Sequence, residues 1–390
     1  MLAAMALLAI VGSPDAFGAQ TFAGRMTGSL FVFLGAVEGV AALAVLDYWG
    51  KRRWKFSGAV VLVGALIATS ISSLLLLIWL QEREFTKYLL IYLPLWFWSL
   101  WALWVVIREK SWKGTPHPKK FAAGVTVTVL IAAANLAYTD IYQPATTPVL
   151  FKLEVKFGKP RIDANRPIIQ LPLVFHATNV GKVAGYILND DYWLYGRSLK
   201  FSYGSEGQKK SRAMMESGYD VGLHVSNPVD EILSTGQPYD VGSWLEPGEE
   251  VHEEKVIQLP KDSKYDLIGV HMEVTEMRKD RGKLGSDYSL VHFSWEKSEG
   301  KSYCPPEKCY DHVFYQGRVR HNNNLVNVTR RPRYITATWG AETPMETFVE
   351  TSIYGPKSKV SEEEADRYGI VLADTEVQIP FAALLSPSDT

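Results

Sequence analysis

The segment Ser57–Leu80 constrains the fold more than any other stretch of this chain, because it contains no Asp, Glu, Lys or Arg. A helix needs roughly 20 consecutive apolar residues to cross the hydrocarbon core of a bilayer. The segment therefore predicts a membrane-spanning helix. Because a helix of this kind crosses a bilayer, the segments on either side of it must begin at the membrane surfaces.

Three further apolar runs flank this segment and predict a four-helix transmembrane domain over residues 26–140. The expected spans are residues 26–46, 57–80, 88–107 and 121–139. The loops after the first and third spans are rich in Lys and Arg, whereas the loop after the second balances its bases with acids. Positively charged loops stay in the cytoplasm. We therefore expect a multi-pass cell-membrane protein whose carboxy-terminal half is extracytoplasmic.

Residues 1–25 allow two interpretations. The run Met1–Val11 is apolar but too short to cross a bilayer, and Ala16-Phe17-Gly18 has the small-x-small form of a signal-peptide cleavage site. No Lys or Arg precedes the apolar run, which favours the alternative of an uncleaved, partly buried amino-terminal segment. Both interpretations stay open at this point.

Glu38 is the ionisable residue that stands out in the membrane half, because it falls near the middle of the first span. An ionisable group at that depth usually faces other helices or a wet cavity. Gly35 and Gly39 form a GxxxG pair beside it, which lets another helix approach closely. We expect Glu38 to be a buried helix-packing site, with Asn135 or the hydroxyls of the second span as partners. Proton or ion handling is the alternative.

The chain changes character after a short Pro- and Thr-bearing linker at residues 141–148. In Val149–Phe157, apolar and charged side chains alternate with the period of two that is typical of a half-buried strand. Short strand-like runs separated by turns predict an all-β antiparallel sandwich over residues 149–390, with an insertion at about 203–244. The further strands are expected at residues 168–176, 183–188, 251–259, 267–274, 288–295, 312–319 and 334–339, and short helices at about 209–216 and 361–368.

Two turn motifs in this half invite a comparison. The segment Phe175–Ala184 reads strand, Asn-x-Gly-Lys turn, next strand, and Leu245-Glu246-Pro247-Gly248 later introduces another strand. The pattern resembles the immunoglobulin-like exported domains of uncharacterised bacterial membrane proteins. The resemblance implies a fold and a location, and it implies no activity. The long insertion and the strands after residue 300 depart from it.

Candidate chemistry is sparse. Cys304 and Cys309 enclose a four-residue loop in the half expected outside, where disulfides persist, so we expect a bridge between them. No catalytic, phosphate-loop or dinucleotide motif appears, and neither a metal nor a cofactor is expected. The lack of a large basic block argues against nucleic acid as a partner. A basic cluster suited to lipid headgroups or an anionic polymer comprises Arg318, Arg320, Arg330, Arg331 and Arg333. The alternative interpretation of this cluster is a solvated face of a sheet.

These features favour a non-catalytic membrane protein that presents an extracytoplasmic β-sandwich for binding, sensing or envelope assembly. Four spans exceed what anchoring requires, so we expect a membrane or envelope protein partner, or self-association. The alternatives are a transporter or channel subunit that uses Glu38, and a cytoplasmic ligand sensor if the topology is inverted. A surface enzyme is a further class. The lack of a nucleophile–base signature argues against it, although catalytic residues far apart in the sequence would leave no such signature.

Overall fold

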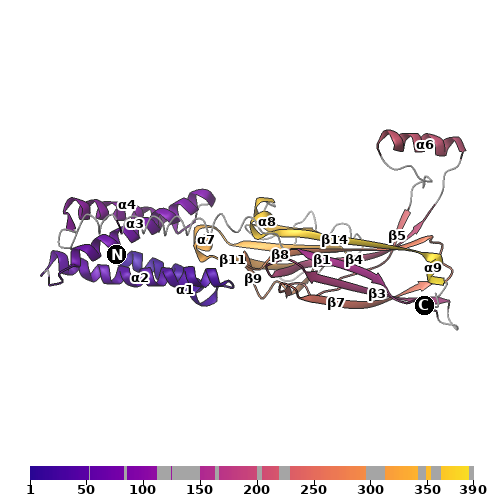
Figure 1. The fold of residues 1–390 in the computed structure, drawn as a ribbon, viewed down its shortest axis with the longest axis horizontal. Helices are drawn as coiled ribbons and strands as arrows, with labels where there is room; N and C mark the ends of the chain where they lie inside the picture. Colours follow the sequence, from indigo (N-terminus) through magenta and orange to yellow (C-terminus); the bar gives the residue numbers. More distant parts are fainter. Residues whose placement is uncertain are drawn as a thin grey trace.

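The structure, a computed structural model, comprises a bundle of apolar helices followed by a β domain (Figure 1). It describes residues 1–390 except 52, 83–85, 112–123, 125–149, 163–166, 200–203, 219–228, 296–311, 341–347, 353–361 and 386–390. The two parts lie end to end along the long axis of the molecule.

The described part of the bundle has four helices: α1 (Leu2–Gly18), α2 (Phe22–Trp49), α3 (Ser57–Glu82) and α4 (Leu89–Arg108). Three of them are long and apolar enough to cross a membrane, over Gly24–Trp49, Ser57–Leu80 and Leu89–Arg108. These stretches coincide with the first three expected spans. The expected fourth span, 121–139, lies outside the described residues apart from a single helical glycine.

Helix α1 packs along α2, and glycines let the two backbones touch. A Cβ atom placed on Gly28 would lie 2.2 Å from the backbone nitrogen of Ala16. A Cβ on Gly12 would lie 2.6 Å from the Cβ of Phe31. Real Cβ atoms do not approach other atoms so closely, so only glycine permits this contact. The apolar segment at the amino terminus is therefore an integral part of the described helix pair.

The described part of the β domain contains three antiparallel sheets. Sheet A comprises β1 (Phe151–Phe157), β2 (Arg161–Ile162), β3 (Ile168–Asn179) and β7 (Glu250–Pro260). Sheet B comprises β4 (Gly185–Ser198), β5 (Val229–Gly236), β6 (Trp244–Leu245), β8 (Leu267–Arg278) and β14 (Ile370–Pro380). Sheet C comprises β9 (Gly282–Leu284), β10 (Val291–Phe293), β11 (His312–His321), β12 (Arg333–Gly340) and β13 (Phe348–Ser352).

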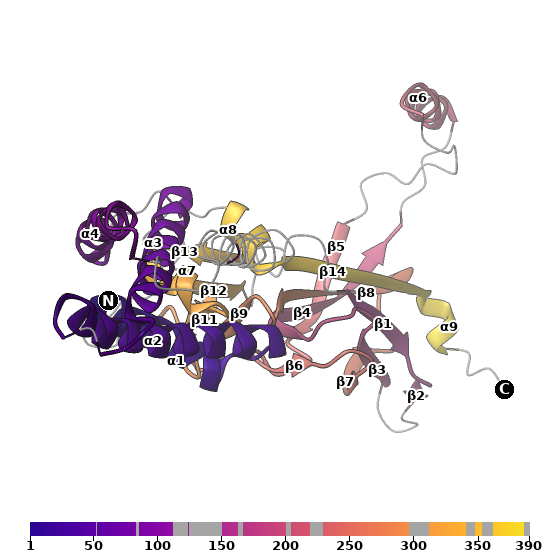
Figure 2. The same ribbon diagram turned by 60° about the vertical axis from the view of Figure 1, so that its left-hand side comes forward.

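Short helices complete the β domain. They are α6 (Gly204–Glu216), α7 (Asn324–Thr329), α8 (Glu362–Tyr368) and α9 (Phe381–Leu385). Helices α6 and α8 correspond to the two helices expected from the sequence, and α6 stands apart from the sheets in both views (Figures 1 and 2). The second part of the expected insertion contains β5, which pairs with β4. That strand therefore belongs to sheet B.

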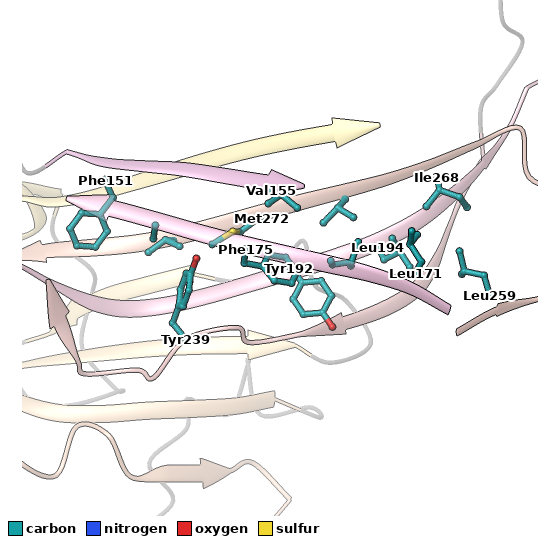
Figure 3. Packing of buried hydrophobic residues seen from close by; sticks show 14 of the residues in the cluster. Phe151, Val155, Leu171, Phe175, Tyr192, Leu194, Tyr239, Leu259, Ile268 and Met272 are labelled. Atoms are coloured by element: carbon teal, nitrogen blue, oxygen red, sulfur yellow. The ribbon is translucent and has the colours of Figure 1, made fainter. Parts of the chain in front are cut away.

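Sheet B is the middle layer and has a core on each face. Between sheets A and B, alternate side chains of β3 such as Leu171 and Phe175 pack against Leu194 and Met272 (Figure 3). On the opposite face, side chains of sheet B pack against sheet C in a second cluster. Strand β4 is buried along nearly its whole length because both of its faces are covered. The immunoglobulin-like affiliation, which would need two sheets, stays a prediction.

Asn179, at the end of β3, joins the two turn motifs of the sequence. Its side-chain nitrogen donates to the carbonyls of Val183 and Leu245, each at 2.9 Å. Its side-chain oxygen accepts from the backbone N–H of Gly181 at 2.9 Å, and its own carbonyl accepts from the N–H of Gly248 at 2.8 Å. Both turns are therefore held by one fully buried residue.

Glu276 on β8 is a buried acid whose protonation affects stability. Its Oε1 accepts a long hydrogen bond of 3.4 Å from the N–H of Phe151. Burial raises the pKa of Glu276 to about 7, and the bond from Phe151 only partly opposes this shift. The folded protein thus binds a proton that the unfolded chain releases at a lower pH. Stability is therefore expected to fall as the pH rises from about 4.5 to about 7.

The variant Glu276→Gln tests this pH dependence, because the amide keeps the shape of the protonated acid and cannot ionise. We expect it to match the wild type at pH 4.5 and to exceed it at pH 8 by about 3 kcal/mol in free energy of unfolding. Chemical denaturation of the detergent-solubilised protein at both pH values measures the difference. An advantage of equal size at both pH values would contradict the prediction.

Candidate functional site: a basic cleft at the membrane junction

The β domain is seated on the helix bundle through the short helix α7. Its apolar residues Leu325 and Val328 join a cluster that includes Val11 of α1 and Tyr92 of α4. The hydroxyl of Tyr92 also donates to the carbonyl of Val328 at 3.3 Å. Because these contacts extend a core of the bundle into the β domain, the two parts share one packed interface.

Polar contacts fix the start of α7 to helix α1. A carboxylate oxygen of Asp15 accepts from the backbone N–H of Asn324 at 2.8 Å. The Asn324 side chain donates to the carbonyl of Val11 at 3.0 Å. An acidic oxygen at the first turn of a helix pairs a backbone donor that the helix itself leaves free. Asp15 therefore serves α7 as a cap from another helix.

The corner between α1 and α2 makes a second set of contacts with the β domain. The side-chain oxygen of Asn322 accepts from the N–H of Gln20 at 3.1 Å, and its nitrogen donates to the hydroxyl of Thr21 at 3.1 Å. The Gln20 side chain donates to the hydroxyl of Tyr186 at 2.9 Å. The corner is thus bound to β4 and to the loop after β11.

A cleft of about 980 Å³ lies beside these contacts, between the α1–α2 corner and strands β6, β9 and β11. Asp287 is the one acid among the described residues that line it. Its neutral polar residues include Gln20, Tyr186, Ser286 and Ser289. The five basic residues that line it, termed here the basic cleft set, are Arg25, Lys279, Lys283, Arg318 and Arg320.

Strand pairing gathers three members of this set on one face. Lys283 of β9 lies directly opposite Arg320 of β11, so their side chains share a face. Arg318 precedes Arg320 by two residues and therefore points the same way. Like charges directly opposite on paired strands are destabilising. The Nε atom of Arg318 is also buried, with no hydrogen-bond partner among the described residues.

The other two basic residues come from outside this strand pair. Lys279 lies 4.0 Å from the ring centroid of Trp244 and bonds to Glu246 at 3.0 Å, so part of its charge is compensated. Arg25 lies in the first turn of α2 and donates from Nε to the carbonyl of Ala19 at 2.9 Å. One wall of the cleft therefore belongs to the membrane part and the other to the β domain.

The basic cluster singled out in the sequence is divided by the fold. Arg318 and Arg320 line the cleft. Arg330 and Arg333 are only 4% and 3% exposed and lie inside the β domain, where Arg330 bonds to the hydroxyl of Tyr368. The backbone carbonyl of Arg331 accepts a hydrogen bond from the Arg333 guanidinium at 3.1 Å. These three residues therefore do not line the described cleft.

Glu38 is fully buried in the bundle at 0% exposure. Neither of its carboxylate oxygens has a hydrogen-bond partner among the described residues. The expected hydroxyl partners Thr69 and Ser72 bond instead to carbonyls of their own helix, and Ser72 also meets Ser99 of α4. Asn135, the other expected partner, lies outside the described residues, as do Cys304 and Cys309.

Gly35 and Gly39 both face α1. A Cβ on Gly35 would lie 3.4 Å from the Cβ of Leu8, and one on Gly39 would lie 3.0 Å from the sulfur of Met5. The helix that approaches this GxxxG pair is thus formed by the segment for which the sequence left a signal peptide open. In the described bundle, α1 occupies the groove that these glycines provide.

Comparisons with known proteins do not identify a family. No protein-family model and no curated protein matches the sequence. Among solved structures, the sporulation control protein Spo0M of Bacillus subtilis is 12% identical, with coverage of 61% of this chain and 93% of that one and a TM-score of 0.20. A structure described as the ApaA protein of Bordetella pertussis is 11% identical, with coverage of 34% and 82% and a TM-score of 0.19. Scores this low carry no argument about fold or function.

Proposed function

We propose that this protein is a non-catalytic, multi-pass membrane protein whose β domain binds an anionic ligand at the membrane surface. The observation that carries the proposal is the basic cleft, which sets five cationic side chains against one acid. Cationic side chains held this close repel one another, so an anion that enters the cleft stabilises the arrangement. The Arg318 guanidinium, whose buried Nε atom has no hydrogen-bond partner among the described residues, supplies planar donors suited to phosphate or carboxylate.

The course of the chain supports a fourth crossing of the bilayer. Helix α4 ends at Arg108, and the following Ser111 lies beside Gly58 at the start of α3. This end of the bundle is opposite the end that contacts α7 (Figure 1). Apart from Gly124, the chain is next described at Leu150, immediately before β1 of the β domain. We propose that the apolar run 121–139 joins the two ends, which makes four spans.

The distribution of basic residues supports an extracytoplasmic β domain. The loop after α2 and the described residues after α4, as far as Ser111, lie together at the end of the bundle away from the β domain. The loop after α2 is rich in Lys and Arg, as is the sequence that follows α4. Since basic loops are retained in the cytoplasm, we propose that this end is cytoplasmic and that the cleft faces the other side.

Binding of inorganic phosphate by the purified full chain tests the proposed function. We expect millimolar phosphate to raise the midpoint of thermal unfolding, because a ligand that binds only the folded state stabilises it. The double variant Lys283→Glu/Arg320→Glu should lose this response. The control Lys152→Glu/Lys261→Glu removes two exposed bases of the same domain outside the cleft and should retain it. Equal responses from both variants would contradict the proposal.

A transporter or channel subunit is the second candidate, and Glu38 favours it. A buried carboxylate without a described partner, deep in a membrane helix, is the usual feature of an ion or proton path. The discriminating measurement is flux in proteoliposomes. A flux that is lost in Glu38→Gln while the bundle stays assembled would favour this candidate over the binding function.

A further inference from the structure

We infer that the ligand of the basic cleft is the phosphate-bearing headgroup of an anionic lipid, held while the acyl chains of the same lipid stay in the bilayer. The inference rests on the proposed function and names the chemical class of its ligand. It depends on three features of the cleft: its position relative to the membrane, its arrangement of charge, and its neutral polar lining.

The cleft lies at the level where the chain enters the membrane. Arg25 is the second residue of the candidate span Gly24–Trp49, so this wall of the cleft is within one helical turn of the boundary between water and lipid. Phe17 and Phe22 flank the same corner and are 86% and 79% exposed. Exposed apolar rings next to the end of a membrane span are suited to insertion at the boundary between headgroups and acyl chains. Lipid headgroups occupy this region.

The charge arrangement fits a phosphate group. Lys283 and Arg320 oppose each other on paired strands, and Arg318 adds a third cation on the same face. Two guanidinium groups present planar, forked donors that match phosphate oxygens, while the ammonium supplies a compact point charge. A bound phosphate offsets the repulsion among these three cationic side chains, which is present when the cleft is empty.

The remaining lining fits the rest of a polar headgroup. The cleft is larger than a single phosphate, and its volume lies in the range of sites that enclose a small organic molecule. The hydroxyls of Ser286 and Ser289 lie in the same lining as Arg318 and Arg320. These groups are suited to the hydroxyls of a glycerol or sugar headgroup.

A free phosphate ester has the same chemistry as a lipid headgroup, and tethering distinguishes the two. A lipid confined to the bilayer is presented to the cleft at an effective concentration in the millimolar range or above. A free ester receives no such advantage. We therefore expect the full chain to retain an anionic lipid under conditions in which dissolved glycerol phosphate binds weakly.

The test uses the full chain reconstituted in nanodiscs of phosphatidylcholine with a minor fraction of phosphatidylglycerol. After transfer to a neutral detergent, native mass spectrometry counts the lipids that stay bound. We expect one phosphatidylglycerol to be retained by the wild type and by Lys152→Glu/Lys261→Glu. Retention should fall at least ten-fold in Lys283→Glu/Arg320→Glu, and it should weaken as salt is raised because the charges are partly exposed. Lys283→Gln/Arg320→Gln replaces the reversed variant if that one does not fold.

Two results would overturn the inference. One is equal retention of phosphatidylcholine and phosphatidylglycerol, and the other is retention of phosphatidylglycerol that the cleft variants do not change. If dissolved phosphate still stabilises the wild type and not Lys283→Glu/Arg320→Glu, the lipid inference fails while the proposed function stands. If neither probe responds to the cleft variants, both fail.

Discussion

Replacing Gly28 with alanine is expected to separate α1 from α2 and to release the β domain from its seat on the bundle. The new Cβ would lie 2.2 Å from the backbone nitrogen of Ala16 and 2.6 Å from the carbonyl carbon of Asp15. Because both atoms belong to the backbone, no side-chain rotation relieves the clash. Helix α1 must shift, and overpacking of this kind costs about 1–3 kcal/mol and occasionally more.

The shift would act directly on the junction. Asp15 carries the carboxylate that holds the start of α7, and Val11 on the same helix accepts from Asn324. Hydrogen exchange across residues 320–330 reports the loss of these contacts between α1 and α7, and we expect faster exchange in Gly28→Ala. Gly18→Ala is the matched control, because a Cβ on Gly18 meets nothing within 4 Å. Unchanged exchange in Gly28→Ala would show that α1 does not hold α7.

Replacing Asn179 with alanine is expected to destabilise the β domain by about 3 kcal/mol. The substitution removes three side-chain hydrogen bonds and leaves the carbonyls of Val183 and Leu245 without this donor. The free energy of unfolding, measured by chemical denaturation in detergent, should fall while the helix bundle retains its far-ultraviolet signal. The loss is large because all three bonds are made by one buried residue.

Two further variants separate the hydrogen bonds from the packing at this site. Asn179→Asp keeps the volume and the acceptor for Gly181, but it replaces the donor with an oxygen that faces two carbonyls. We expect it to be at least as destabilising as Asn179→Ala. Val180→Ala changes the neighbouring exposed side chain and should stay within about 0.5 kcal/mol of the wild type. A mild effect of Asn179→Asp would show that the donors contribute little.

The membrane part was predictable because its signal is local. Uncharged runs of the required length mark α2, α3 and α4 directly, and the observed ends differ from the expected ones by only a few residues at most. The sequence did not reveal that residues 2–18 form a helix that packs along α2. A segment shorter than a span is ambiguous by length alone, and its role becomes clear only when Gly12 is found against Phe31.

The β domain was predictable where one face of a strand is buried. The period of two in β1 and β3 reflects a single covered face, and both strands were found. Strand β4 carries apolar and acidic residues on both faces because sheets A and C cover it on either side, so the expected strand ended ten residues early. Strand β14 lies at the edge of sheet B, and its weaker pattern was missed entirely.

The cleft could be predicted only in part, because its residues meet through pairing and docking. Arg318 and Arg320 were noticed as members of a basic run, yet their neighbours in that run turn into the interior. Lys283 joins them through the register of β9 with β11, and Arg25 joins through the seating of the β domain on the helices. Neither contact could be predicted from how close these residues are in the sequence.

One wall of the cleft belongs to the helices and the other to the β domain. Ligand binding is therefore coupled to the docking of the β domain on the helices. Any ligand that contacts Arg25 and Arg320 together stabilises the docked arrangement of the two parts. By thermodynamic reciprocity, a change in the packing of the helices that moves Arg25 must alter the affinity of the cleft by the same factor. Thickness or tension of the surrounding bilayer would then act as an effector of binding, although it touches no residue of the site.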